Sequence, residues 1–154
     1  MSKNTLEKFY KAFQAHDARI MAECYHKEVV FNDPAFQNLN WKEVTAMWAM
    51  LIERSKGNLE ITYDSVMGDE EMAQCIWEAD YEFSKTGNTV HNIIHATMEF
   101  KDGLIIKHTD HFNFWRWSKM ALGLPGALLG WTPILKGKVR KMARKSLDKY
   151  MEEN

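Results

Sequence analysis

Apolar residues that recur every three or four positions predict helices in the first third of the chain. One stripe consists of Leu6, Phe9, Tyr10 and Phe13, and another of Val44, Met47, Trp48, Leu51 and Ile52. Asn4 with Glu7, and Asn40 with Glu43, have the spacing of capping boxes, so the two helices are expected to begin there. Asp17 is expected to cap a short helix between them, and Gly57 to end the last one.

From Leu59 onward the apolar period changes to strict alternation, which predicts strands. Four runs follow, over residues 59–65, 75–83, 92–100 and 104 to about 114. Turn signals separate these runs, among them Gly68-Asp69 and Lys101-Asp102-Gly103. Helices followed by an antiparallel meander predict an α+β fold, in which the strands curl around the helices and leave a cavity.

The pattern changes again after Phe114. We expect residues 1–114 to form a cone-shaped α+β barrel domain, and 115–154 to be a C-terminal helical extension of the same domain. Glycines and Pro125 should break the apolar segment 115–135 into short helical pieces. A basic helix should follow Pro133, packing over the barrel mouth or against a second subunit, with contact to a membrane surface as the alternative.

Composition narrows the function classes. The 154 residues carry a net charge of −1 and are 45% hydrophobic, which favours one globular domain and argues against nucleic-acid binding. Cys24 and Cys75 have no metal-type spacing and are expected to be free thiols. Neither a signal peptide nor an apolar run long enough to span a membrane is recognisable, so a cytoplasmic location is expected. We expect no metal site, because His91 and His95 lie on the strand face opposite Asn92 and His108 does not share a face with His111. No phosphate loop or nucleophile motif occurs, so no cofactor is expected.

Asp33 is the first candidate catalytic residue. It follows the apolar run Val29-Val30-Phe31-Asn32 and precedes Pro34, so a strand should end there with the carboxylate among apolar neighbours. Such surroundings raise a carboxyl pKa, as a general base requires. The alternative is an aspartate that only caps a turn.

His108, Asp110 and Phe112 should share the inward face of the last strand. A histidine and an aspartate two positions apart on that face need hydrogen bonds or a solvated pocket. Asn92, at the rim of the neighbouring apolar strand face, should join this polar group. The alternative is a hydrogen-bonded His–Asp pair with a purely structural role.

The order of elements resembles the nuclear-transport-factor-2-like superfamily of cone-shaped α+β barrels. The resemblance covers roughly residues 6–114, and it depends on two motifs, Tyr25-His26…Phe31-Asn32-Asp33-Pro34 and Gly103-Leu104-Ile105…His108-Thr109-Asp110. The superfamily includes steroid Δ5-isomerases, SnoaL-like polyketide cyclases and limonene epoxide hydrolase.

The resemblance assigns expected roles to particular residues. Asp33 resembles the base of the steroid isomerases, whose two oxyanion donors have no counterparts here, since Phe9 and His95 or Ala96 stand at their positions. His108 and Asp110 match the cyclase motif, in which the aspartate removes a proton next to a carbonyl. No inward-facing arginine is expected, so the Asp-Arg-Asp relay of the hydrolase is incomplete. The residues expected to bind substrate are Tyr25, Trp77, Tyr81, Asn92 and Phe112.

These observations leave three functions open. The first is a cofactor-free isomerase or cyclase that acts by proton abstraction on a small apolar carbonyl substrate, with Asp33 or Asp110 as base. The second is a pocket that only binds a lipid-like or polyketide-like ligand. The third is an interaction or membrane-surface protein that acts through its basic C-terminal helix. The expected homodimer would pair through the sheet face bearing Glu78, Asp80, Glu82, His91 and His95.

Overall fold

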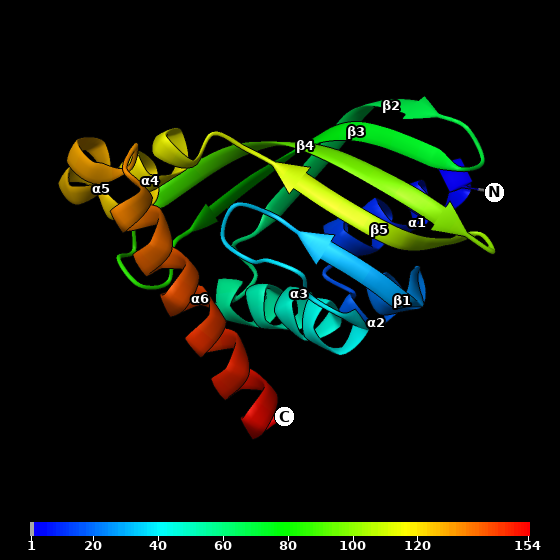
Figure 1. The fold of residues 1–154 in the computed structure, drawn as a ribbon, viewed down its shortest axis with the longest axis horizontal. Helices are drawn as coiled ribbons and strands as arrows, with labels where there is room; N and C mark the ends of the chain where they lie inside the picture. The colour runs from blue at the N-terminus through cyan, green and yellow to red at the C-terminus, as the bar shows by residue number, and fades with distance from the viewer. Residues whose placement is uncertain (1) are drawn as a thin grey trace.

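A curved five-stranded sheet arches over the N-terminal helices in the computed structural model, which describes residues 2–154 (Figure 1). Residues 2–154 form six helices and five strands. In chain order these are α1 (Ser2–Gln14), α2 (Ala18–Glu23), β1 (Tyr25–Asn32), α3 (Trp41–Ser55), β2 (Glu60–Gly68), β3 (Met72–Glu82), β4 (Thr89–Lys101), β5 (Leu104–His111), α4 (Phe114–Leu122), α5 (Leu124–Leu129) and α6 (Pro133–Glu153). The expected α+β class is confirmed.

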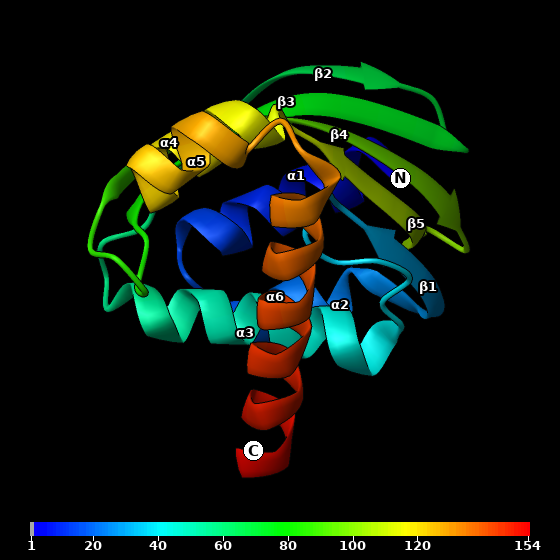
Figure 2. The ribbon, with the colours of Figure 1, turned by 60° about the vertical axis from the view of Figure 1, so that its left-hand side comes forward.

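The strands are ordered β1-β5-β4-β3-β2, and the sheet does not close into a full barrel. All neighbours among β2 to β5 are antiparallel. β1 is parallel to β5, with Phe31 opposite His108. Helix α1 lies inside the arch and α3 crosses below it (Figure 2). The parallel pair brings the end of β1, where Asp33 follows, beside the strand that carries Asp110.

Side-chain chemistry sets most of the helix boundaries. The capping box of Asn40 and Glu43 is confirmed, and Asp17 caps α2 by accepting from the backbone N–H of Ile20. Helix α3 ends at Ser55, and Lys56 and Gly57 both have positive φ. The capping box expected at Asn4 is wrong, because α1 already includes Ser2 and Asn4 lies inside it.

The last strand also ends earlier than expected. β5 stops at His111, not near Phe114, because the side chain of Asn113 accepts a hydrogen bond from the backbone N–H of Arg116 and so caps α4. A side chain that satisfies a free helix N–H stabilises a helix start over a continued strand. Phe112 consequently follows the strand and yet packs inward.

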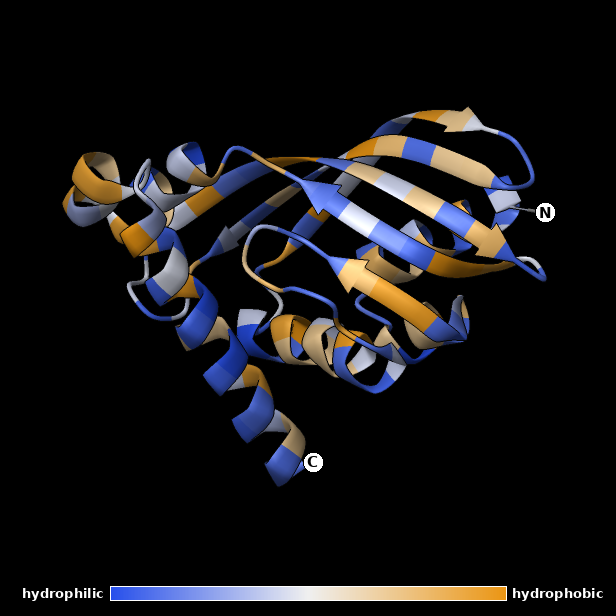
Figure 3. Cartoon of the chain, viewed as in Figure 1, coloured by the Kyte–Doolittle hydropathy of each residue, from blue (hydrophilic) through white to orange (hydrophobic). Residues whose placement is uncertain are grey.

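The core is mainly aromatic between α1, α3 and the sheet. The Phe9 ring makes edge-on contacts with Tyr25, Trp48 and His108, at centroid distances of 5.4 to 6.0 Å. Apolar and polar residues alternate along the strands (Figure 3), with Cys75, Trp77 and Ala79 buried on the concave face of β3. The alternation read from the sequence therefore gave the correct inward register.

The C-terminal segment forms short helices, as expected, and then the long helix α6. Helix α6 packs against α3: the Arg144 guanidinium pairs with Glu43, and the Tyr150 hydroxyl donates to Glu53 at 2.8 Å. The basic helix therefore does not lie on the acidic outer face of its own sheet. Within residues 2–154 no helix combines the length and apolarity needed to cross a bilayer.

Candidate functional site

A cavity of about 200 Å³ lies between the concave face of the sheet, α3 and α6. Its walls are mostly aromatic and aliphatic, a composition typical of small-molecule sites. The apolar lining includes Phe13, Phe36, Trp48, Met50, Leu51, Ala79, Phe83, Ile94, Phe112, Trp117, Val139 and Met142. The polar residues of the wall are Asp33, Tyr81, Asn92 and Asp110, together with Arg54, Ser55, Glu82, Ser84, Lys85 and Ser146.

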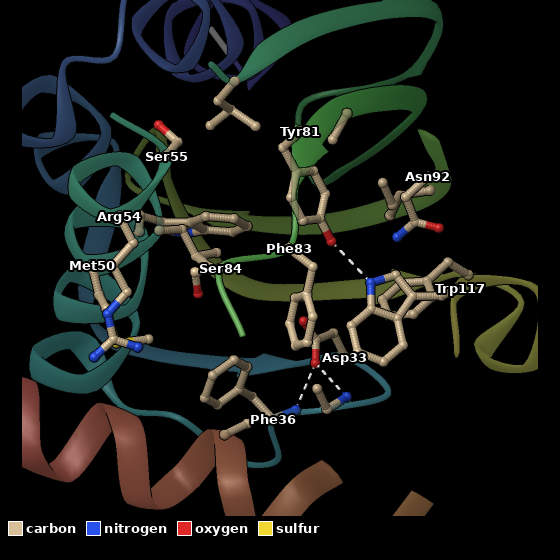
Figure 4. Close-up of a pocket in the computed structure, with 18 of the residues that line it drawn as sticks. Asp33, Phe36, Met50, Arg54, Ser55, Tyr81, Phe83, Ser84, Asn92 and Trp117 are labelled. Atoms are coloured by element: carbon tan, nitrogen blue, oxygen red, sulfur yellow. Dashed lines mark hydrogen bonds between the residues drawn. The ribbon is translucent and has the colours of Figure 1, made fainter. Parts of the chain in front are cut away.

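Asp33 both caps a turn and faces the cavity. Its Oδ1 accepts from the backbone N–H groups of Ala35 at 2.7 Å and Phe36 at 2.6 Å (Figure 4). Pro34 favours this turn directly after β1. Asp33 as a whole is half-buried. Its carboxyl group borders the cavity and is surrounded by protein atoms.

The pKa of Asp33 is raised to about 7. Burial is the main cause, because an ionised carboxylate is poorly solvated among apolar groups. The two backbone N–H groups and the charge of Arg140 oppose the shift, and the charge of Asp110 adds to it. Asp33 can therefore either accept or donate a proton near neutral pH.

Asp110 lies at the end of a buried hydrogen-bond chain. Trp48 Nε1 donates to the Tyr25 hydroxyl at 2.9 Å, Tyr25 Oη lies 2.7 Å from His108 Nδ1, and His108 Nε2 lies 2.9 Å from Asp110 Oδ1. Trp77 Nε1 donates to the same Oδ1 at 3.4 Å. We refer to Trp48, Tyr25, His108 and Asp110 as the hydrogen-bond chain.

One arrangement of hydrogens satisfies the whole chain. The Trp48 indole can only donate, so the Tyr25 oxygen accepts from it and its own hydrogen goes to His108 Nδ1. His108 is then the neutral tautomer with its hydrogen on Nε2, and it donates to Asp110. Every donor in the chain thus points toward Asp110, whose Oδ1 accepts the last hydrogen bond.

Tyr81 and Asn92 supply hydrogen-bond donors to the cavity. Trp117 Nε1 donates to the Tyr81 oxygen at 2.9 Å (Figure 4), so the hydroxyl hydrogen of Tyr81 is left for another acceptor. Burial raises the pKa of Tyr81 to about 12, so the hydroxyl stays protonated. Asn92 is buried, and within residues 2–154 its side-chain amide has no hydrogen-bond partner.

The structure brings six of the eight candidate residues to the cavity wall: Asp33, Trp77, Tyr81, Asn92, Asp110 and Phe112. Tyr25 and His108 do not border the cavity and lie behind Asp110 in the hydrogen-bond chain. Sequence reasoning missed the polar roles of Trp48 and Trp117. The helical stripe places Trp48 in the core, but nothing in that pattern identifies the acceptor of its N–H group.

The expectation of no inward-facing arginine is wrong in one respect, because Arg54 borders the cavity from the exposed end of α3. Arg140 donates from Nε to the carbonyl oxygen of Pro34 at 3.0 Å. Neither arginine forms a hydrogen bond or ion pair with Asp33 or Asp110 in the described chain, so an Asp–Arg–Asp relay is not assembled. Among residues 2–154, no three His, Cys, Asp or Glu side chains form a cluster suited to a metal ion.

Comparison with known proteins agrees with this architecture. The sequence model of the SnoaL-like domain matches residues 6–108. This chain belongs to the SnoaL-like domain family. The matched part of this SnoaL-like protein includes β1 to β4 and most of β5, and it ends two residues before Asp110. No curated protein matches the chain significantly in sequence.

Solved structures share the fold at low sequence identity. An NTF2-like protein of unknown function from Cytophaga hutchinsonii has a TM-score of 0.60 at 10% identity, over 73% of this chain and 90% of its own. IdmH from Streptomyces antibioticus, a candidate polyketide cyclase, has a TM-score of 0.66 at 14% identity, over 80% and 99%. An LEH-like epoxide hydrolase from Mycobacterium tuberculosis has a TM-score of 0.60 at 17% identity, over 83% and 95%. These similarities show the nuclear-transport-factor-2-like fold alone.

Proposed function

We propose that this SnoaL-like protein is a cofactor-independent isomerase or cyclase that transfers a proton next to a carbonyl group of a small, largely apolar substrate. One observation supports this proposal most strongly: two aspartates, which are shielded from solvent more than the exposed Glu82, border one apolar cavity with different hydrogen-bond partners. Asp110 accepts from His108 and Trp77, whereas Asp33 has a pKa near 7. A carboxyl group with a pKa near neutral pH at the edge of an apolar cavity is typical of acid–base catalysis.

Asp33 is the proposed general base. A base with a pKa near the working pH combines sufficient ionisation with sufficient proton affinity. One oxygen of Asp33 is held by the backbone, which leaves the other oxygen to take the proton from a substrate carbon. The negative charge of Asp110 helps to keep Asp33 basic.

Tyr81 and Asn92 are the proposed donors to the substrate oxygen. When the proton leaves the carbon, negative charge develops on the carbonyl oxygen, and donors fixed beforehand stabilise that charge. Trp117 fixes the Tyr81 oxygen by its own N–H group. Tyr25 and His108 are positioning residues, because they act through Asp110 and do not border the cavity. Trp48 borders the cavity with its ring and holds the Tyr25 hydroxyl by its N–H group.

Proton abstraction can be tested without knowing the product. The full chain would be incubated in D₂O with a panel of cyclic unsaturated ketones and β-diketones, and exchange at carbons next to the carbonyl would be followed by proton NMR. We expect enzyme-dependent exchange that Asp33→Asn slows by about a hundredfold or more. Asp102→Asn, a change at an exposed turn, is the control and should leave the rate unchanged.

The pH dependence of the exchange rate distinguishes the roles of the two aspartates. With Asp33 as base, the rate rises with pH and levels off above about 7. A rate that falls through the same range would make protonated Asp33 the acid and Asp110 the base. Exchange that persists in both Asp33→Asn and Asp110→Asn would refute the mechanism.

Ligand binding without catalysis is the second candidate function. The observation in its favour is that His108 and Tyr25 are fully hydrogen-bonded within the protein, as a purely structural pair would be. Saturable binding of a panel compound, measured by quenching of tryptophan fluorescence, with no exchange at any pH would support this function over the enzyme.

A further inference from the structure

Five large apolar side chains near the start of the C-terminal extension are left uncovered. They are Leu124, Leu128, Leu129, Trp131 and Ile134, with exposed fractions between 50% and 71%. We call these five residues the apolar tip. Helix α5, which carries three of them, lies at one end of the molecule (Figures 1 and 3). Isolated exposed apolar residues are common, but five of them within eleven residues of the chain concentrate apolar surface in one segment, as is typical of an interaction surface.

The chain around the apolar tip is strongly cationic. Residues 111–147 contain eight Lys and Arg and no Asp or Glu, whereas the rest of the chain contains 12 Lys and Arg and 21 Asp and Glu. A shallow groove beside the tip is lined by Trp115, Trp131, Lys136 and Arg140. The Lys119 ammonium lies 4.0 Å from the centroid of the Trp115 ring. Aromatic and cationic groups are thus interleaved on this surface.

The indole N–H groups of Trp131, in the tip, and of Trp115, beside it, are already satisfied within the protein. Trp131 Nε1 donates to the carbonyl oxygen of Leu128, and Trp115 Nε1 donates to that of Ala127, each at 3.0 Å. The two indole rings can therefore leave water without leaving an unpaired N–H group. Helix α5 is also held firmly, because Gly126 packs directly on the backbone of Ser118.

We propose that the apolar tip and its surrounding lysines and arginines form a docking surface for a lipid bilayer that contains anionic phospholipid. The apolar side chains would enter the boundary between headgroups and acyl chains, where tryptophan is favoured. The cationic groups would bind the lipid phosphates, and each Lys or Arg near such a surface adds to the affinity. None of the five residues of the apolar tip borders the cavity, so this surface is separate from the proposed catalytic residues.

A second copy of the chain fits this surface less well. A symmetric contact between two tips would bring the cationic groups of both copies together, because the same patch occurs on each side. A contact between the tip and the outer face of another sheet would pair the cationic groups, but it would place the apolar tip against a face that bears Glu78, Asp80 and Glu82. A bilayer satisfies both the apolar and the cationic groups at once.

Vesicle co-sedimentation of the full chain tests the proposal. The probes are vesicles of phosphatidylcholine alone and vesicles containing about 30% phosphatidylglycerol. We expect binding to the anionic vesicles that weakens at high salt, because salt screens the charges. The double variant Leu128→Ser/Ile134→Ser should weaken binding about tenfold or more. Met67→Ser/Met72→Ser, which changes two exposed apolar residues at the other end of the sheet, is the matched control and should bind as the wild type does.

A second pair of variants tests the charge. Lys138→Glu/Lys141→Glu changes two exposed lysines of α6, and we expect binding to fall about tenfold or more. Lys8→Glu/Lys11→Glu makes the same change on α1 and should have little effect. Circular dichroism confirms that each variant is folded. Absence of binding to anionic vesicles, equal loss in test and control variants, or a dimer that only the tip variants dissociate would overturn the proposal.

Discussion

His108 Nε2 lies 2.9 Å from Asp110 Oδ1, and at most 2% of either side chain is exposed. Burying a carboxylate costs free energy unless hydrogen-bond donors satisfy it. Here His108 donates to Asp110, and the hydrogen-bond chain continues from His108 through Tyr25 to Trp48. The Asp110 carboxylate therefore faces the cavity in an orientation that is set by residues on β1, α3 and β5. An acid or base that acts in a fixed position requires such hydrogen bonds from neighbouring residues.

Removing the Tyr25 hydroxyl should destabilise the protein. Tyr25→Phe leaves the Trp48 N–H group and His108 Nδ1 buried without partners, so we expect the free energy of unfolding in urea to fall by about 2–4 kcal/mol. Tyr150→Phe removes one exposed hydrogen bond to Glu53 and should cost about 0.5–1 kcal/mol. Equal costs for the two variants would show that the hydrogen-bond chain adds nothing to stability.

Asp33 should make the stability depend on pH. Its pKa is about 7 in the folded protein and near 3.8 in the unfolded chain. The folded state thus holds this proton more tightly, so its contribution is complete below about pH 4 and is lost as pH rises through 7. Relative to Asp33→Asn, the wild type should lose about 2–4 kcal/mol between pH 4 and pH 8. Parallel pH profiles in urea unfolding would contradict the raised pKa.

Two glycines of the C-terminal extension should respond in opposite directions to alanine. A Cβ at Gly126 would lie 1.9 Å from the backbone oxygen of Ser118, so Gly126→Ala must separate α4 from α5 and should cost about 2–4 kcal/mol. A Cβ at Gly137 meets nothing within 4 Å, and Gly137→Ala should stabilise α6 by about 0.5–1 kcal/mol. Thermal unfolding of both variants measures the contrast.

The two cysteines should be inert in the folded protein. Both are free and buried, and burial raises the pKa of Cys24 to about 11 and that of Cys75 to about 12. Only the thiolate reacts rapidly with a disulfide reagent. At pH 8, Ellman's reagent should modify both thiols more than a hundredfold faster in urea than in buffer alone. Rapid modification of the folded protein would mean that β3 or the end of α2 opens readily.

The inward and outward faces of the strands could be predicted from the sequence, because the alternation of apolar and polar residues is a local property. It placed Trp77, Asn92, His108 and Asp110 on inward faces, and the structure agrees. The helix starts at Asp17 and Asn40 were equally local, since a side chain and a backbone group three residues away decide them. The false start at Asn4 shows the limit of such signals, because two extra residues can extend a helix beyond a plausible cap.

The partners across the fold could not be predicted from local patterns. The N–H group of Trp48 meets Tyr25, 23 residues away, and that of Trp117 meets Tyr81, 36 residues away. The same holds for α6, whose Val139 and Met142 form part of the cavity wall. Periodicity shows that such side chains are buried, but only the packed structure shows what they contact.

The parallel pairing of β1 with β5 has a consequence for how the protein folds. Phe31 and His108 are register partners 77 residues apart, so this pair closes a very long loop, and contacts of such sequence separation form slowly. The β2–β5 meander can form from neighbouring hairpins before that closure. We therefore expect Asp33 and Asp110 to meet only in the last stage of folding, so that a partly folded intermediate lacks the assembled cavity wall.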